Sequence, residues 1–490
     1  MEVYISGVGM TKFGRSKDSL DKMMAEAAGL ALQDAGLDRV DAIYIGVMNV
    51  EEFIGDSNFA ALLTNTLHLT GIPSTRVETA SSTGAGAFET AFYAVASGHM
   101  KDVLVLAGEK MTHLPTPKVT RILSEVIDRS ERRYGATMPA LAALIAQRYA
   151  KEYGLSPSLL EDILAQVAIK NHENGFLNPV AQFRKRITKD DYLKSQMVSY
   201  PLRLYDCAPI TDGAAAMVLT SRPTSVIVSG IGHATDTMAV RHRFSLTSFN
   251  STKEAARRAY HMAQVNPSEI QFAEVHDAFT PFEIIGTEDL GFFPPGKGWK
   301  ALNEGMTELK GKLPINPSGG LKSRGHPVGA SGLAQLVEIV YQLRGEAGEE
   351  RQMERAEIGL AQSIGGLGNN NFVIILERSD RKKVRVGGWK LEYHPEINVS
   401  EKTLDGPPLE GMGILESFTI LHSPPQGFLS PLALAFVKRR DGERVMACNP
   451  NYRSPRKLKI GKEVFLRIQE GLYVFERLTF WKRLKSWLKN

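Results

Sequence analysis

An internal repeat constrains the fold of this chain more than any other feature. The stretch VYISGVGMTKF, from Val3, returns as VIVSGIGHATD, from Val226. After each copy come, in the same order, a helical face, an apolar strand, a glycine-rich turn entering a second helix, and closing strands. Five matches in one order predict a duplicated unit, so we expect two like halves, residues 1–222 and 223–378, packed against each other.

The first copy predicts an α/β layer. Residues 2–9 read as a buried strand, and residues 102–107, DVLVLA, as another. The helix between them has one apolar face, made of Leu20, Met23, Met24, Ala27, Ala28 and Ala31. Alternation of strand and helix predicts a largely parallel sheet.

Residues from about 112 to 200 interrupt this alternation. Helical periodicity covers residues 138–149 and 159–168, whereas KNHENGFLNPVAQFRKRIT, residues 170–188, is polar and shows no strand pattern. We therefore expect an inserted, mostly helical lobe.

Bulk composition limits the class of protein. The 490 residues are 43% hydrophobic and 23% charged, which suits two or three globular domains. No apolar run reaches the length of a membrane span, and the first residues lack a signal-peptide pattern, so a cytoplasmic location is expected. The two cysteines, Cys207 and Cys448, are too few for a disulfide framework or a cysteine-based zinc site. We interpret Cys207 as a buried structural thiol.

Charge is distributed unevenly. Residues 380–490 hold 21 Lys and Arg against 12 Asp and Glu, a balance of +9, while the whole chain carries +5. A domain boundary near residue 380 follows, with residues 379–490 forming a linker, a small all-β barrel and a basic tail. The barrel is predicted from short strands separated by Ser-Pro-Pro, Arg-Asp-Gly and Asn-Pro turns.

Two glycine-rich turns stand at corresponding places in the two halves. The first, SSTGAGAF, begins at Ser81, and the second, NPSGGLKSRGHPVGASG, spans residues 316–332 and contains His326. Glycine lets backbone approach a ligand closely, and the N-terminus of the following helix offers free N–H groups. In packed halves, Ser81 and His326 would face each other across a pseudo-two-fold axis.

These motifs, together with HDAF at residues 276–279 and SIGG at residues 363–366, resemble the thiolase superfamily, in particular archaeal and sterol-carrier-protein-X-type thiolases. The resemblance covers roughly residues 1–378. It implies a duplicated, five-layered αβαβα thiolase fold, assembly into a dimer or tetramer, and chemistry on acyl-CoA thioesters in lipid metabolism. Coenzyme A would enter as the substrate thioester, with no bound cofactor and no metal.

The same resemblance assigns candidate catalytic residues. The family's nucleophilic cysteine is matched by Ser81, and the second cysteine, which acts at the substrate α-carbon, by Ser363. The family's catalytic histidine maps to His326, and His276 matches the residue that orients an oxyanion-hole water. Glycine and serine backbone would complete the substrate-binding and oxyanion-hole set: Gly365, Gly366, Ser318, Gly319 and Gly320.

Serine at both cysteine positions changes the expected chemistry. A hydroxyl is a far weaker nucleophile than a thiolate near neutral pH. Acyl transfer is one expectation; aldol-type cleavage of a β-hydroxyacyl-CoA, which needs an enolate but no acyl-enzyme, is a second. A non-catalytic scaffold that binds acyl-CoA or lipid is a third.

The C-terminal barrel resembles the OB-fold, acyl-CoA-associated proteins that partner thiolases, although no cysteine between residues 380 and 447 could hold their zinc ribbon. Acyl-CoA pathway enzymes are therefore expected partners. Single-stranded nucleic acid is the disfavoured alternative ligand, because aromatic residues at strand spacing are usually core. Residues 475–490 predict a basic amphipathic helix that docks on the protein's own surface, with membrane-surface contact as the alternative.

Overall fold

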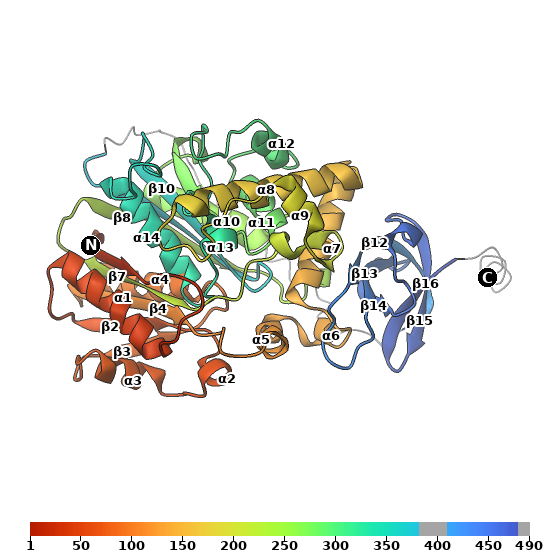
Figure 1. Ribbon diagram of the computed structural model, residues 1–490, viewed down its shortest axis with the longest axis horizontal. Helices are drawn as coiled ribbons and strands as arrows, with labels where there is room; N and C mark the ends of the chain where they lie inside the picture. Colours follow the sequence, from red (N-terminus) through yellow and green to blue (C-terminus); the bar gives the residue numbers. More distant parts are fainter. Residues whose placement is uncertain (382–408, 479–490) are drawn as a thin grey trace.

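The computed structural model describes residues 1–381 and 409–478. Two α/β halves lie together with a helical lobe, and a small barrel lies beside the lobe at the end of the molecule away from the N-terminus (Figure 1). The linker expected before residue 409 and most of the expected amphipathic tail lie outside the described residues. No helix in the described ranges is long and apolar enough to cross a membrane.

The N-terminal half follows the predicted order. Its strands are β1 (Tyr4–Met10), β2 (Ala42–Gly46), β3 (Ser74–Val77), β4 (Asp102–Glu109) and β7 (Gly213–Thr220). Its helices are α1 (Leu20–Ala35), α2 (Val50–Ile54), α3 (Phe59–Thr66) and α4 (Thr83–Ala96). The six residues predicted to form the buried face of α1 are all buried, and Gly36, in the left-handed conformation, ends the helix.

The C-terminal half repeats this order. Its strands are β8 (Val226–Thr235), β9 (Phe272–Glu274), β10 (Ile358–Gly365) and β11 (Asn370–Arg378). Its helices are α10 (Asn250–Ala263), α11 (Thr280–Asp289), α12 (Gly298–Asn303), α13 (Gly320–Ser323) and α14 (Ser331–Arg344).

The repeated Ser-Gly-x-Gly motif has a packing reason. A Cβ on Gly9 would lie 2.3 Å from the Ala27 carbonyl oxygen of α1, and a Cβ on Gly232 would lie 1.8 Å from the Ala255 carbonyl oxygen of α10. Both distances are far below van der Waals contact. Glycine in β1 and β8 therefore lets each outer helix lie directly on its strand, in the same way in both halves.

One nine-stranded sheet runs through both halves in the order β3-β2-β4-β7-β1-β8-β11-β10-β9. The halves meet where β1 pairs with β8. The prediction of a largely parallel sheet is wrong: only β2–β3, β2–β4 and β9–β10 are parallel. After the lobe, the chain re-enters as β7 between β4 and β1 and runs antiparallel to both, without a crossover helix.

Three apolar clusters mark the layers of this mixed α/β fold. One lies between α1, α3 and the N-terminal strands, and another between α10 and the C-terminal strands. The third surrounds α4 and α14 and includes residues from strands of both halves. The helices that follow the two glycine-rich turns are therefore the inner ones.

The lobe contains α5 (Thr116–Leu123), α6 (Arg129–Arg132), α7 (Met138–Glu152), α8 (Pro157–Leu177), α9 (Lys189–Lys194), β5 (Met197–Ser199) and β6 (Leu202–Arg203). The second predicted helix, residues 159–168, is longer in the structure, because α8 continues through the polar stretch to Leu177. Its polar side chains are buried with partners: Lys170 pairs with Glu283 at 2.9 Å, and the Asn171 amide donates to Asp277 at 2.7 Å. Because these side chains are buried against polar partners, the buried face of this part of α8 is not made of apolar residues, and hydrophobic periodicity does not detect it.

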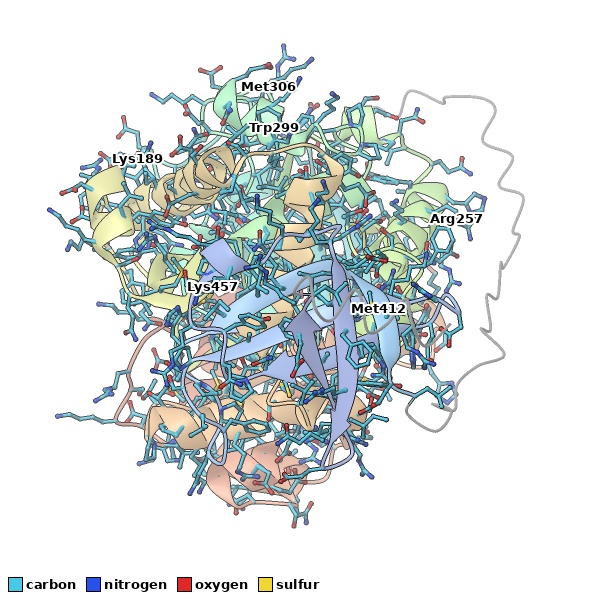
Figure 2. All side chains as sticks on the ribbon, turned by 90° about the vertical axis from the view of Figure 1, so that its right-hand side faces the viewer. Lys189, Arg257, Trp299, Met306, Met412 and Lys457 are labelled. Carbon is cyan, nitrogen blue, oxygen red and sulfur yellow. The ribbon has the colours of Figure 1, made fainter. Side chains whose placement is uncertain are left out.

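The barrel consists of β12 (Gly411–Leu421), β13 (Leu432–Arg439), β14 (Arg444–Asn449), β15 (Glu463–Gln469) and β16 (Leu472–Arg477). Its strand order is β13-β14-β16-β15-β12, and pairing of β12 with β13 closes it. Figure 2 looks onto this barrel, with the rest of the molecule behind it.

The barrel is joined to the lobe by backbone pairing and by a common core. Leu421 at the end of β12 pairs with Ser199 of β5, and the Ser417 hydroxyl donates to the Leu144 carbonyl at 2.6 Å. Buried residues of α7, α8 and the barrel strands form one continuous apolar cluster. The barrel and the lobe therefore form one packed unit.

Candidate functional site

A cavity of about 960 Å³ lies where the two halves, the lobe and the barrel meet. The halves contribute Ser81, His276, His326 and Gly366, and the lobe contributes residues of α5, α7, α8 and α9. The barrel side contributes Leu421, the last residue of β12, and Ser423. Much of the wall is apolar: Met48, Met111, Leu123, Val126, Met138, Ile187, Val198, Ile210, Phe279, Phe282, Val328 and Leu421.

Ser81 lies on a tight turn between β3 and α4. Ala80 has a φ of 56°, in the left-handed region that non-glycine residues rarely adopt, and the Thr83 hydroxyl holds its carbonyl at 2.6 Å. The turn directs Ser81 to the cavity wall. Among the described residues its hydroxyl has no hydrogen-bond partner, so no base in that part of the chain contacts it directly.

His326 lies on the loop between α13 and α14. Its Nδ1 is 2.7 Å from the Ser331 hydroxyl, which in turn donates to the Pro327 carbonyl at 2.9 Å. Because the single hydroxyl proton is used there, Ser331 accepts from Nδ1–H, and Nε2 keeps a free lone pair. Burial, and then the nearby Arg324 charge, lower the pKa of His326 to about 3. The ring is therefore a neutral base at neutral pH.

His276 lies beside His326, with ring centroids 5.3 Å apart and planes at 88°. Its Nδ1 is buried without a hydrogen-bond partner among the described residues. Burial, followed by repulsion from His326 and Arg324, holds the pKa of His276 well below its ordinary value. Two neutral imidazoles thus line one cavity, and one of them has an unused buried nitrogen.

Ser363 and Gly365 lie at the end of β10, next to the Ser81 turn. A Cβ on Gly365 would lie 2.4 Å from the Thr79 carbonyl oxygen, so only glycine allows this approach. The Ser363 hydroxyl is buried without a partner, packed against Gly332 at the start of α14. Neither residue lines the cavity, whereas Gly366 does.

Ser318, Gly319 and Gly320 lie beneath the cavity wall and do not line it. The Ser318 hydroxyl donates to Glu274 at 2.7 Å, and Glu274 also pairs with Arg324 at 3.3 Å. A Cβ on Gly319 would lie 2.6 Å from the Gly175 Cα of α8. The contacts of Ser318 and Gly319 hold the His326 loop to β9 and to the lobe.

Polar residues outside the predicted candidate set also line the cavity, among them His172, Lys322 and Cys207. His172 of α8 and Lys322 of α13 are buried there, and Cys207 adjoins them. Burial raises the pKa of the Cys207 thiol to about 12, so it stays protonated. His172 comes from the polar stretch that follows the second predicted helix. Lys322 comes from the glycine-rich loop, whose candidates were Ser318, Gly319, Gly320 and His326.

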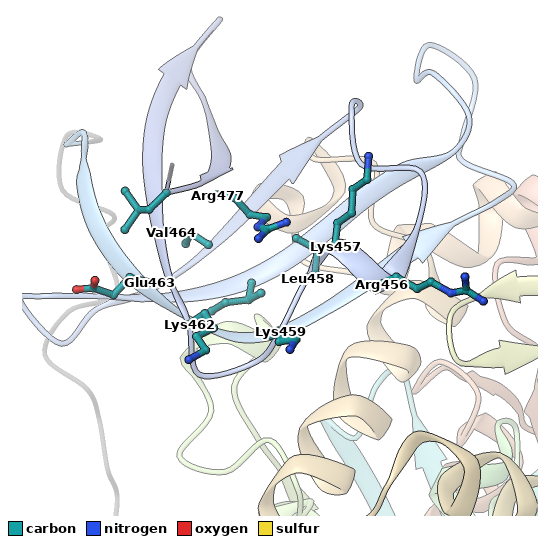
Figure 3. A pocket seen from close by; sticks show the side chains of 10 residues that line it. Arg456, Lys457, Leu458, Lys459, Lys462, Glu463, Val464 and Arg477 are labelled. Carbon is teal, nitrogen blue, oxygen red and sulfur yellow. The ribbon is translucent and has the colours of Figure 1, made fainter. Parts of the chain in front are cut away.

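A second, smaller cleft of about 310 Å³ lies on the barrel (Figure 3). Its floor is apolar, and its exposed cations are Arg456, Lys457, Lys459, Lys462 and Arg477. It contains no aromatic residue on which a nucleic-acid base could stack. In residues 1–381 and 409–478, no three His, Cys, Asp or Glu side chains are grouped to hold a metal ion.

Known proteins resemble this chain over both halves. The family description "Thiolase, N-terminal domain" matches residues 3–223, and "Thiolase C-terminal domain-like" matches residues 232–378. An acetyl-CoA acetyltransferase of Methanothermobacter thermautotrophicus is 43% identical over 390 residues, covering 77% of this chain and all of that protein. Sterol carrier protein 2 of Bos taurus is 34% identical over 385 residues, covering 74% of this chain and 70% of that protein.

Solved structures share the fold. A monomeric SCP2-thiolase like protein type 1 from Mycobacterium smegmatis superposes with a TM-score of 0.74 at 14% identity, covering 97% of this chain and 99% of that one. An Ltp2-ChsH2(DUF35) aldolase gives a TM-score of 0.66 at 24% identity, covering 78% of this chain and 98% of that one.

Proposed function

The chain belongs to the thiolase family, and on that premise we propose that it makes or breaks a carbon–carbon bond next to an acyl-CoA thioester. The proposal takes CoA thioesters as substrates and requires no metal. Its support is the pair of neutral histidines, His276 and His326, in a large and mostly apolar cavity beside Ser81.

Within this chemistry, the site suits an enolate better than an acyl-enzyme. No base in the described ranges contacts Ser81 directly, and an acyl-serine is an oxygen ester whose return to CoA is uphill. In aldol-type cleavage, Nε2 of His326 would take the β-hydroxyl proton as the Cα–Cβ bond breaks. The products are a carbonyl compound and an acyl-CoA enolate, and the proton on His326 then returns to Cα. The N–H of neutral His276 and backbone N–H groups near Ser81 would donate to the enolate oxygen.

Incubation with β-hydroxyacyl-CoA and β-ketoacyl-CoA panels, each with short and long chains, tests this mechanism. We expect cleavage of a β-hydroxyacyl-CoA, lowered by about 10²–10⁴ in His326→Ala. Thiolysis of β-ketoacyl-CoA that exceeds the cleavage would instead support acyl transfer. No turnover of either panel, together with an unaffected His326→Ala variant, would remove the catalytic proposal.

Loss of both cysteines also favours a second candidate, a scaffold that binds acyl-CoA or lipid without catalysis. Ser81 and Ser363 stand where the family's cysteines are expected. A scaffold predicts acyl-CoA binding that persists in His326→Ala, with no turnover by the wild-type protein. Binding by calorimetry, run beside the turnover panels, separates the two.

We also infer that the barrel is of the OB type. Numbered along the barrel, its strands close in the order 1-2-3-5-4-1, and its third and fifth strands, β14 and β16, are parallel. A barrel of this kind could form the family's partner domain within the same chain. Assembly into a dimer or tetramer stays a prediction, which light scattering of the purified protein would test.

A further inference from the structure

Lys322 is a buried cation that makes no ion-pair contact with a carboxylate in the described part of the chain. Among the described residues three lysines are buried: Lys110, Lys170 and Lys322. Lys110 pairs with Asp212 at 2.9 Å and Lys170 with Glu283 at 2.9 Å. Lys322, only 2% exposed, has no carboxylate within ion-pair distance in the described part of the chain; its ammonium donates to the Cys207 carbonyl.

The nearest carboxylates already have other partners. Asp206 accepts from the Tyr192 and Thr280 hydroxyls at 2.7 and 2.6 Å. Asp277 accepts from the Asn171 amide and the Leu321 backbone, at 2.7 and 2.6 Å. An ammonium has three protons to donate, so Lys322 retains donors beyond the Cys207 carbonyl. Burying a charge without a partner is costly, which makes this position unfavourable unless another group completes it.

The surroundings of Lys322 show what could complete it. Lys322 lines the large cavity together with His172 and Cys207, and apolar residues such as Phe279 and Phe282 line the same space. His172 directs Nδ1 to the Lys185 carbonyl at 3.0 Å, and burial and Lys322 lower the pKa of His172 to about 4, so its ring is neutral. Among the charged residues that line the cavity, Lys185, Asp191 and Lys194 are exposed, and Lys322 is buried. One buried cation with neutral groups beside it suits a singly charged anion better than a phosphate, which usually meets several cations.

We propose that Lys322 selects acyl thioesters that carry a carboxylate on the acyl chain. This inference rests on the proposed function only in taking an acyl thioester as the occupant of the cavity. Lys322 would be a specificity-determining residue: the carboxylate takes the ammonium protons that no protein anion uses, while the chain packs on the apolar wall.

Thioesters of N-acetylcysteamine test the proposal without the phosphates of CoA. Succinyl, adipyl and sebacyl thioesters are compared by calorimetry at pH 7 with the matched butyryl, hexanoyl and decanoyl thioesters. The wild-type protein should bind at least one carboxylate-bearing thioester about tenfold more tightly than its neutral match. Equal binding at all three lengths would overturn the proposal, whatever the fate of the variants.

Variants then locate the preference. Lys322→Met should abolish it, Lys322→Arg should keep part of it, and Lys118→Met, an exposed lysine of α5 outside the cavity wall, should leave it intact. A preference that survives in a folded Lys322→Met protein, verified by its thermal melt, contradicts the assignment.

A further binding measurement tests whether Lys322 instead binds a phosphate of the CoA nucleotide. Adenosine 3′,5′-bisphosphate should bind wild type and Lys322→Met equally; weaker binding to Lys322→Met would assign the cation to the nucleotide instead. None of these measurements needs turnover. The proposed reaction can therefore fail while the carboxylate preference stands, and the reverse also holds.

Discussion

His326 is neutral because burial and the nearby Arg324 charge lower its pKa. Nδ1 donates to Ser331, and Nε2 keeps its lone pair in a buried site near Arg324. A histidine whose pKa is lowered binds a proton only when the pH falls to the lowered value. The base form therefore persists from alkaline pH down toward the pKa of about 3.

NMR of protein labelled at histidine carbons tests this state. The His326 resonance should stay constant between pH 8 and 4.5, and the His172 resonance should shift with a midpoint near 4. His233 serves as an internal control. Burial lowers its pKa, but hydrogen bonds to Glu89 and Asn370 and the Glu89 charge together outweigh burial, so its pKa should lie above the ordinary value. A His326 midpoint near 6.5 would contradict the proposed tautomer and environment.

Ser81 and Ser363 decide which reaction the site can perform. If no acyl-enzyme forms, Ser81→Ala should keep β-hydroxyacyl-CoA cleavage within about tenfold of wild type, far from the 10²–10⁴ expected for loss of a general base. The double change Ser81→Cys with Ser363→Cys should raise thiolysis of β-ketoacyl-CoA, because thiolates are available near neutral pH. Stopped assays on both substrate classes measure the outcome. Ser81→Ala falling to the level of His326→Ala would indicate a covalent role for Ser81.

At the scale of elements, glycines in β1 and β8 set the distance between strand and helix. Gly232→Ala places a methyl group 1.8 Å from the Ala255 carbonyl, so α10 must move away from β8. Overpacking of this kind typically lowers the free energy of unfolding by about 1–3 kcal/mol. Because the clash is with backbone, we expect the loss for Gly232→Ala to lie at or above the upper end of that range. Chemical denaturation with circular dichroism measures the change.

Gly29 provides the matched control for Gly232. It lies on α1, and an added Cβ there meets nothing within 4 Å. Alanine should stabilise this helix by about 0.4–1 kcal/mol. Equal effects of the two substitutions would show that helix propensity, and not close packing, explains the repeated motif.

Elements whose apolar residues recur at helical or strand spacing were predictable, whereas elements held by buried polar contacts were not. The buried face of α1 and the strands of the barrel follow directly from residue patterns. The last turns of α8 were missed because Lys170, Asn171 and His172 are polar and yet buried. Lys170 and Asn171 contact residues more than 100 positions away, and His172 contacts the Lys185 carbonyl. The direction of β7 depends on how the lobe returns the chain, which no local pattern records.

The residues of the candidate site also divide into those that sequence motifs predicted and those that they did not. Ser81, His276, His326 and Gly366 were predicted by motif and come together in the cavity. Lys322 was part of a recognised motif, yet its significance depends on its having no ion-pair contact with a carboxylate among the described residues, a property of packing. The barrel's contribution to the cavity also could not be predicted, because the contact between Leu421 and β5 joins residues over 200 positions apart.

At the scale of the whole molecule, the barrel should remain attached when the chain is cut. A protease site inserted between residues 382 and 408, followed by cleavage, should give two pieces that coelute on size exclusion. The β5–β12 pairing and the common apolar cluster hold them together.

The Ser417→Asp variant, cut at the same site, is compared with the cut wild-type protein. Ser417 is fully buried, and its hydroxyl donates to the Leu144 carbonyl; a carboxylate there has no proton to donate and remains unpaired. The cut variant should separate into two species. Separation of the cut wild-type protein under the same conditions would show that the common core contributes little to holding the pieces.

The pairing of β12 with β5 has a kinetic consequence as well. Were the barrel a separate protein, the fraction of complete cavities would fall on dilution, and the rate per molecule would fall with it. Joining both in one chain typically keeps such a pair at an effective concentration in the millimolar range, however dilute the solution. Dissociation of the barrel should therefore not lower the specific activity when the enzyme is diluted. Every newly made chain also contains the barrel residues that complete its own cavity wall.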